Sequence, residues 1–121
     1  MSACELCAPR DVLLESDLAY ARYDSNSLGR GHVIVVPKRH VADFFDMNGG
    51  EQSAVLALLN QARRLVREKH SPDGYNIGAN IGRAAGQSRM HVHVHLIPRY
   101  KGDVPDPGGG IRCVLQASKN P

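Results

Sequence analysis

The sequence predicts an α+β fold, an antiparallel sheet of about five strands with one long and one short helix. Short apolar and β-branched runs outnumber helical patterns, and they lie too close together for a helix to cross over between each pair. Only one stretch has the periodicity of a long helix. Because 121 residues is the length of one compact domain, we expect a single domain over residues 1–121, with a loop-rich tail over about 100–121.

The strands are predicted from β-branched runs and from the residues that interrupt them. The segment before Pro37 is the clearest strand, since four β-branched residues precede a proline that cannot donate to a ladder. Gly78 interrupts a later strand, and Pro98 stops the strand after it. The expected strands cover residues 12–16, 18–23, 32–37, 75–81, 90–97 and 111–115, and turns or loops cover 24–31, 82–88 and 100–110.

The long helix is predicted over residues 51–69. Asn48 and Glu51 have the spacing of a capping box at its start, and Pro72 prevents it from continuing. A short helical turn is expected over residues 41–47. The apolar residues of the long helix recur at spacings of three and four, which line one face, and they are Val55, Leu58, Leu59, Ala62, Leu65 and Val66.

Composition argues against several classes of protein. The net charge is +3, the basic residues are scattered, and four Tyr, two Phe and no Trp offer few surfaces for stacking bases, so we expect no nucleic-acid partner. The apolar runs are too short to span a bilayer, so we expect no membrane association. Glu5 and Asp11 fall where an export signal would be apolar, so a cytoplasmic protein is the expectation.

The most unusual feature is a row of three histidines. In a strand, His91, His93 and His95 share one face, while the apolar residues between them face the helix. Alternate residues lie about 6.6 Å apart, so a neighbouring pair can share a metal ion but all three would be strained. The alternative is nucleophilic catalysis, in which one neutral imidazole attacks an electrophile and its neighbours orient it and stabilise charge.

The loop before this row favours nucleophilic catalysis at a phosphate. Gly82 and Gly86 allow backbone N–H groups to converge on an anion, and Gln87 and Ser88 add side-chain donors. Two arginines in the same stretch add positive potential. The segment therefore predicts a phosphate-binding loop.

The three cysteines cannot all pair with one another. Cys4 and Cys7 have the spacing of half a metal site, and two reduced thiols are the alternative. We interpret Cys113 as an ordinary thiol.

Four segments together resemble one protein family. His91-Val-His-Val-His-Leu-Ile97 resembles the histidine triad motif, in which three histidines alternate with apolar residues, and this motif defines the HIT family of nucleotide hydrolases and transferases. The family's other landmarks are similar to Gly31-His-Val-Ile-Val-Val-Pro-Lys-Arg-His40, Asp73-Gly-Tyr-Asn-Ile-Gly78 and Ala85-Gly-Gln-Ser88. The likeness covers the chain from Cys4 to about Arg112 and is closest to small bacterial members often labelled diadenosine polyphosphate hydrolases.

The resemblance implies a reaction at the α-phosphate of a nucleoside phosphoester, phosphoanhydride or phosphoramidate. His93 would attack phosphorus to form a covalent nucleotidyl-histidine, His95 would contact the phosphate and the scissile atom, and water would release a nucleoside monophosphate. We expect a carbonyl on a neighbouring strand to hold the other ring nitrogen of His93. The chemical step needs no catalytic metal, although Mg²⁺ would suit a polyphosphate substrate.

Three other functions stay open at this point. The nucleotidyl group could pass to an acceptor other than water, or the protein could be a nucleotide-binding regulator with little turnover. A metallohydrolase in which His93 and His95 bind a catalytic metal is the third alternative.

The resemblance also assigns binding residues for a nucleotide substrate, with adenine as the expected base. Asp24 matches the position that binds the ribose hydroxyls, and His32 would lie beside the triad. The chain departs from the family at Arg89, where relatives usually carry an apolar residue. The phosphate and nucleotide contacts would come from Asn80, Gln87, Ser88 and His95.

The resemblance also implies a metal site and an oligomeric state. Cys4 and Cys7 would join His40 and His91 in a structural Zn²⁺ site that holds the N-terminus against the sheet. Two chains would pair their sheets in a homodimer.

Overall fold

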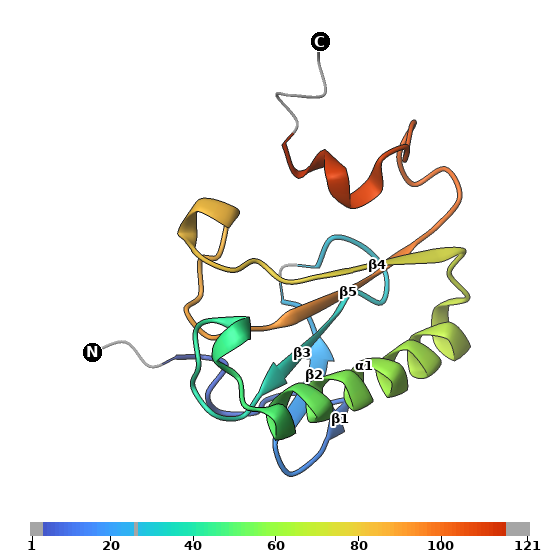
Figure 1. Ribbon diagram of the computed structural model, residues 1–121. Helices are drawn as coiled ribbons and strands as arrows, with labels where there is room; N and C mark the ends of the chain where they lie inside the picture. The colour runs from blue at the N-terminus through green and yellow to red at the C-terminus, as the bar shows by residue number, and fades with distance from the viewer. Residues whose placement is uncertain (1–3, 26, 116–121) are drawn as a thin grey trace.

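The computed structural model describes residues 4–25 and 27–115, and in them a five-stranded antiparallel sheet lies against one long helix (Figure 1). The strand order is β1-β2-β3-β5-β4. This confirms the predicted α+β class, with 3₁₀ turns in place of a second α-helix. The elements are β1 (Leu14–Glu15), β2 (Ala19–Tyr23), β3 (Val33–Pro37), η1 (Phe44–Asp46), α1 (Gly49–His70), β4 (Gly74–Gly78), η2 (Arg83–Ala85), β5 (Val94–Arg99) and η3 (Gly110–Val114).

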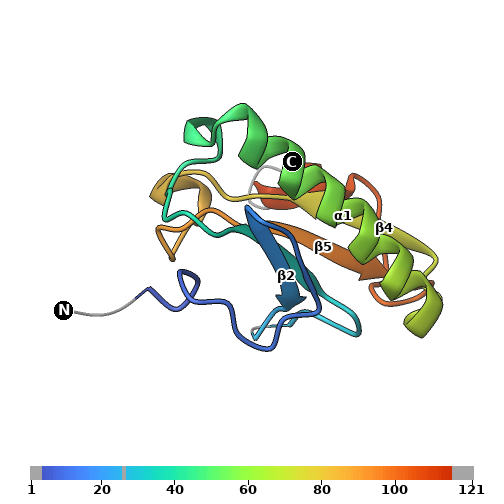
Figure 2. The ribbon, with the colours of Figure 1, turned by 90° about the horizontal axis from the view of Figure 1, so that it is seen from below.

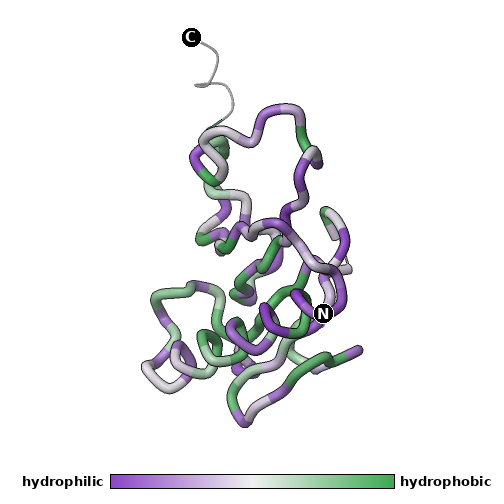
Figure 3. Tube along the Cα trace, turned by 90° about the vertical axis from the view of Figure 1, so that its right-hand side faces the viewer, coloured by the Kyte–Doolittle hydropathy of each residue, from purple (hydrophilic) through white to green (hydrophobic). Residues whose placement is uncertain are grey.

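The two faces of the sheet are covered by different segments. Helix α1 crosses one face, and the N-terminal segment lies against the other (Figure 2). In β3, Val33 and Val35 face the helix while Ile34 and Val36 face the N-terminal segment, as the period of two requires. In Figure 3 the hydrophobic stretches of the chain gather in the part of the molecule formed by the sheet and α1. The site described below lies on the face opposite α1.

Helix α1 begins at the predicted capping box. The Asn48 side chain accepts from the Glu51 N–H at 2.8 Å, and the Glu51 carboxylate accepts from the Asn48 N–H at 2.9 Å. Glu51 is 2% exposed, and its two carboxylate oxygens accept from Nε and Nη2 of Arg39, each at 2.8 Å. The helix therefore starts at a fixed point beside the end of β3.

The histidine segment differs from its prediction at both ends. The strand β5 begins at Val94 rather than at residue 90, because the Val92 N–H donates to the Val41 carbonyl at 2.8 Å and so leaves the ladder. Pro98 lies inside β5 instead of ending it. The ladder with β3 stops at Leu96, so the missing N–H of Pro98 interrupts no bond to β3. Alternation nevertheless persists through residues 91–93, since Val92 is in the core.

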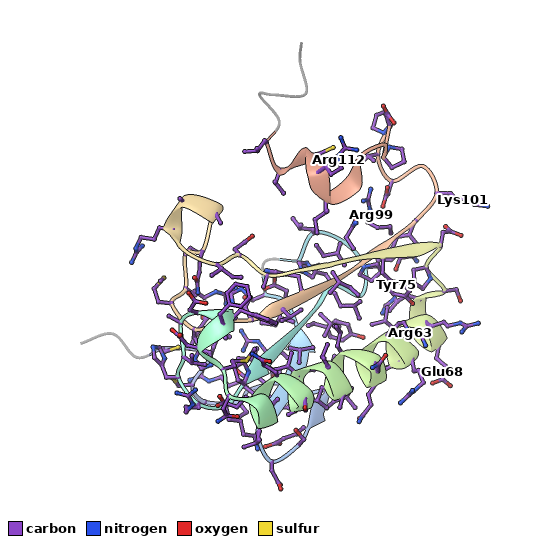
Figure 4. The ribbon with its side chains drawn as sticks, viewed as in Figure 1. Arg63, Glu68, Tyr75, Arg99, Lys101 and Arg112 are labelled. Atoms are coloured by element: carbon purple, nitrogen blue, oxygen red, sulfur yellow. The ribbon has the colours of Figure 1, made fainter. Side chains whose placement is uncertain are left out.

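The predicted edge strand over residues 111–115 is wrong. This segment forms the 3₁₀ helix η3, because Gly109 and Gly110 adopt φ of +86° and +48° and turn the chain over the end of the sheet. A Cβ at Gly78 would lie 3.3 Å from Ile111 Cδ1, so the glycine of β4 leaves room for η3. Figure 4 shows Arg112 on η3 and Arg99 at the end of β5. The remaining residues of the predicted tail, 116–121, lie outside the described residues.

Within the part of the chain that the structure describes, no helix has the length and apolar character that a membrane crossing demands.

Candidate functional site

A cavity of about 200 Å³ opens on the sheet face opposite α1. Its walls come from the end of β2, the turn before β3, the loop between β4 and β5, and the start of β5. The sequence had assigned most of these positions to a nucleotide site, and the fold brings them together. The cavity is lined by Asp24, Leu28, His32, Asn80, Gly86, Ser88, Arg89, His93 and His95.

The half-buried His93 has a defined tautomer. Its Nδ1 lies 3.0 Å from the His91 carbonyl, which can only accept, so Nδ1 carries the proton and Nε2 keeps its lone pair. The acceptor is two residues upstream and not on a neighbouring strand as expected, because residues 91–93 precede the β5 ladder. Burial lowers the pKa of His93, and the Arg89 charge adds to this lowering. His93 therefore presents a neutral nucleophilic nitrogen.

A chain of hydrogen bonds fixes the tautomer of His95. The Leu28 N–H donates to His32 Nδ1 at 3.0 Å, so the proton of neutral His32 is on Nε2. That Nε2 lies 2.9 Å from His95 Nδ1 and donates to it. His95 Nδ1 is therefore an acceptor, and its own proton is on Nε2. The rings of His93 and His95 lie 4.9 Å apart, which places a nucleophile beside an N–H donor.

The histidines of the cavity are uncharged at neutral pH. Burial and the neighbouring His93 and His32 lower the pKa of His95 to about 4, although the Asp24 carboxylate acts in the opposite sense. Burial also lowers the pKa of His32, again against the effect of Asp24. Protonation would break the hydrogen-bond chain, because an imidazolium has no acceptor nitrogen. The arrangement thus favours neutral rings.

Asp24 is buried beside these rings, with 6% of its surface exposed. Its Oδ2 lies 3.5 Å from His32 Nε2 and 3.7 Å from His95 Nδ1, and its Oδ1 lies 3.5 Å from an Arg89 nitrogen. The Asp24 N–H donates to the His32 carbonyl at 2.9 Å and so holds the turn between β2 and β3. A carboxylate in this place can accept from two hydroxyls of a ligand.

The predicted binding residues of the loop between β4 and β5 do not all reach the cavity. Asn80 and Ser88 are exposed at the cavity wall. The Gln87 side chain is buried and instead holds the loop, since its Oε1 accepts from the Gly82 N–H at 2.8 Å and its Nε2 donates to the Ala42 carbonyl at 2.7 Å. Gln87 does not line the cavity, and its amide braces the loop that carries Ser88.

Two contacts of the site were missed from the sequence. The Arg89 guanidinium reaches into the cavity wall and pairs with the Glu5 carboxylate, which also lies 3.5 Å from Arg22. Glu5 comes from the N-terminal segment between the two cysteines. No sequence pattern joins positions so far apart, and only the path of the N-terminal segment across the sheet brings them together. Leu28 was also missed, because its contribution is a backbone N–H.

The four residues expected to bind a metal form a cluster that could hold one. Their ligand atoms all lie within 4.8 Å of one another. The Cys4 Sγ and Cys7 Sγ lie 3.4 and 3.6 Å from His91 Nδ1, and Cys7 Sγ lies 3.1 Å from His40 Nδ1. Sulfur and nitrogen ligands of one tetrahedral Zn²⁺ are about 3.5 Å apart, which these separations approach.

The tautomer of His91 also fits a metal site. Its Nε2 lies 2.7 Å from the Pro37 carbonyl and donates to it, so the lone pair of Nδ1 faces the cysteines. His91 is fully buried, in contrast to the two other histidines of the row. The three histidines therefore belong to two different sites. His91 faces the cysteine cluster, whereas His93 and His95 line the cavity.

A second group, Asp24, His32 and His95, also has ligand atoms close enough to hold a metal. It does not include His93, which the metallohydrolase alternative would need. A metal here would have to displace the proton that the Leu28 N–H holds on His32 Nε2. The hydrogen-bond chain accounts for this group without an ion.

Comparisons with known proteins identify the family of this chain. The model of the HIT domain matches residues 5–102. An uncharacterized HIT-like protein of Methanocaldococcus jannaschii is 40% identical over 95 residues, covering 78% of this chain and 73% of that protein. The AP-4-A phosphorylase of Mycobacterium tuberculosis is 36% identical over 93 residues, and the match spans 76% of this chain but only about half, 48%, of the relative.

One solved structure among the relatives is of a zinc-bound protein. The crystal structure of a Zn-bound histidine triad family protein from Mycobacterium smegmatis is 30% identical, has a TM-score of 0.75, and is matched over 97% of this chain and 96% of that one. The domain match covers most of the chain and includes the whole histidine row. On this evidence and on the geometry of the site, the chain belongs to the HIT family.

Proposed function

We propose that the protein is a nucleotide hydrolase that attacks the α-phosphorus of a nucleoside phosphoanhydride, phosphoester or phosphoramidate and releases a nucleoside monophosphate. The observation that carries the proposal is the hydrogen bond from His93 Nδ1 to the His91 carbonyl, because it directs the basic electron pair to Nε2. An adenine nucleotide, such as a dinucleoside polyphosphate, is the expected substrate. The AP-4-A phosphorylase among the relatives supports this substrate class.

The reaction follows from the two tautomers. His93 Nε2 forms a bond to the α-phosphorus while the bond from phosphorus to the leaving group breaks, and the leaving group departs with that electron pair. The N–H at His95 Nε2 donates a hydrogen bond to the charge that develops in this step. Water then forms a bond to the phosphorus of nucleotidyl-His93 and releases a proton to solvent, the P–N bond breaks, and the nucleoside monophosphate leaves as His93 regains its lone pair.

The other cavity residues would hold the nucleotide. Asp24 would accept from the ribose hydroxyls, and Asn80 and Ser88 would donate to phosphate oxygens. Gln87 would support these contacts by bracing the loop rather than by reaching the ligand. Mg²⁺ would accompany a polyphosphate substrate as part of the ligand.

Transfer to phosphate instead of water is a serious variant of this function, because one relative is named as a phosphorylase. The two variants share every step up to nucleotidyl-His93. A regulator that binds nucleotide without turnover would need neither the ordered lone pair of His93 nor the fixed donor of His95.

The cysteine cluster would hold a structural Zn²⁺ in this function. Cys4, Cys7, His40 and His91 supply four ligands of the kind found in closed zinc sites, and the Zn-bound relative supports the assignment. Four protein ligands leave no place for water, so the ion would anchor the N-terminal segment to the sheet. The chemistry of the cavity would stay with His93 and His95.

We also expect a homodimer. Among the described residues, no strand pairs with the outer side of β4, and β4 carries no charged residue to protect this edge. An apolar groove of about 340 Å³ lies beside it, bordered by Phe45, Leu56 and Ile77, which are 74%, 59% and 48% exposed. Analytical ultracentrifugation should find a dimer that Ile77→Glu dissociates, and an unchanged mass in this variant would contradict this interface.

The central test compares His93→Ala with the parent protein on a diadenosine polyphosphate. We expect turnover to fall by roughly 10⁴-fold or more, while calorimetry still detects binding of a nucleoside monophosphate. Water labelled with ¹⁸O should place the label in the released monophosphate of the parent enzyme. Turnover of the variant within tenfold of the parent would refute the proposal, and loss of binding alone would favour a role for His93 outside the chemistry.

A further inference from the structure

Arg89 lies at the cavity but has no role in the proposed reaction steps. Its side chain is 23% exposed and lines the cavity together with His93 and His95. It carries the one Lys or Arg charge among the described residues that line this cavity. Burial keeps His32 and His95 uncharged by lowering their pKa values. Among the described residues that line the cavity, Arg89 is therefore the side chain that can offer positive charge to an entering polyanion.

The pairing of Arg89 with Glu5 is one that an anion can replace. One guanidinium nitrogen pairs with Glu5, whose side chain is 55% exposed, and another lies 3.5 Å from Asp24 Oδ1. An ion pair with so exposed a carboxylate contributes little stability. Glu5 also lies 3.5 Å from Arg22, so it would keep a cationic partner if Arg89 turned away. Guanidinium groups bind phosphate with two parallel N–H donors, which is stronger and more directional than this exposed pair.

We propose that Arg89 determines leaving-group specificity: it exchanges Glu5 for the phosphate next to the α-phosphorus, and so favours substrates whose leaving group is a phosphate anion over those whose leaving group is uncharged. This inference rests on the proposed nucleotide hydrolysis. Glu5 acts as a gate in this exchange, because it occupies the guanidinium while the cavity holds no phosphate.

The state of His95 is consistent with this preference. A neutral imidazole donates a hydrogen bond through Nε2–H but does not readily give the proton away. An amine or alkoxide leaving group needs that proton to depart, whereas a phosphate leaves as a stable anion. A cation at Arg89 and a neutral donor at His95 therefore serve the same kind of leaving group.

The phosphate could be part of the leaving group or free phosphate that attacks nucleotidyl-His93, since both occupy the same side of the α-phosphorus. Added inorganic phosphate distinguishes the two sources. Phosphate-dependent release of a nucleoside diphosphate from the parent enzyme, lost in Arg89→Gln, assigns the position to the acceptor as well. Release of monophosphate alone, with the substrate preference described next, assigns it to the leaving group.

The experiment measures kcat/KM for a diadenosine polyphosphate and for adenosine 5′-phosphoramidate, whose leaving group is ammonia. The ratio of the two should fall by at least about tenfold in Arg89→Gln and less in Arg89→Lys, which keeps the charge. Arg83→Gln is the matched control, because Arg83 is an exposed arginine of the same loop that does not line the cavity. Glu5→Gln should keep or raise the ratio.

The outcomes separate the two proposals. A ratio in Arg89→Gln within twofold of the parent, in protein with the parent's melting temperature, overturns the role of Arg89 while hydrolysis stands. The same fall in Arg83→Gln overturns it too, since a general field would then explain the effect. A parent protein that hydrolyses neither substrate overturns the proposed function and this inference with it. If Arg89→Gln does not fold, the comparison of Arg89→Lys with the parent decides by the same ratio.

Discussion

The hydrogen bond between His32 and His95 can be tested by a matched pair of substitutions. His32→Asn keeps an acceptor where Nδ1 receives the Leu28 N–H, but removes the N–H that reaches His95 Nδ1 at 2.9 Å. His32→Gln does the reverse, because its Nε2 takes the place of the imidazole Nε2. His32 is 1% exposed, so water cannot easily replace the lost donor. His95 would then lose the bond that fixes its tautomer.

The size of the effect follows from the energy of an unmade buried hydrogen bond. If the loss of this hydrogen bond raises the activation free energy by about 1–3 kcal/mol, kcat falls by roughly 5- to 150-fold. We expect this fall in His32→Asn and a partial rescue in His32→Gln, with KM changing less than kcat in both. Single-turnover kinetics on a diadenosine polyphosphate measure the nucleotidylation step directly. A folded His32→Asn protein with kcat within twofold of the parent would refute the hydrogen-bond chain as the device that orients His95.

Three further predictions concern pH, metal and stability. The acid limb of the kcat/KM profile should lie below pH 6.5, because burial lowers the pKa values of His93 and His32 and lowers that of His95 to about 4, and activity is lost as pH falls through these lowered values. A limb at or above 6.5 would contradict buried neutral rings. Cys7→Ala should lose bound Zn²⁺ by elemental analysis and melt about 5 °C or more below the parent, and a parent protein that purifies from zinc-containing medium without the ion would contradict the site. Glu51→Ala should reduce the free energy of unfolding in urea by about 2–4 kcal/mol, because it leaves Arg39 and the Asn48 N–H without their partner, whereas a loss below about 0.5 kcal/mol would contradict that role.

The elements that the sequence predicted well are those governed by local rules. The helix and its capping box depend on spacings within a few residues, and the alternation around His91 to Leu96 depends only on the period of a strand. The family resemblance added the residues of the cavity, which lie on four separate segments. The structure brings most of these positions to one cavity, although Gln87 does not line it, and their roles in binding and catalysis stay predictions.

The errors arose where tertiary contacts override local pattern. The strand predicted over residues 90–97 begins later because the Val92 N–H donates a hydrogen bond to the Val41 carbonyl. Residues 111–115 form a 3₁₀ helix because two glycines with positive φ turn the chain. Gln87 has a side-chain amide that could bind a ligand. This amide instead accepts from the Gly82 N–H and donates to the Ala42 carbonyl. Such partners lie at positions that no spacing rule connects.

The most direct test of the account is rapid-quench mass spectrometry of the enzyme with an adenylated substrate. The tautomer of His93 predicts that a peptide containing this residue gains the mass of one adenylyl group before product appears, and that the adduct is acid-labile, as a P–N bond requires. An adduct on a different residue would contradict this account, and so would turnover at full rate without any adduct when chemistry is shown to limit it.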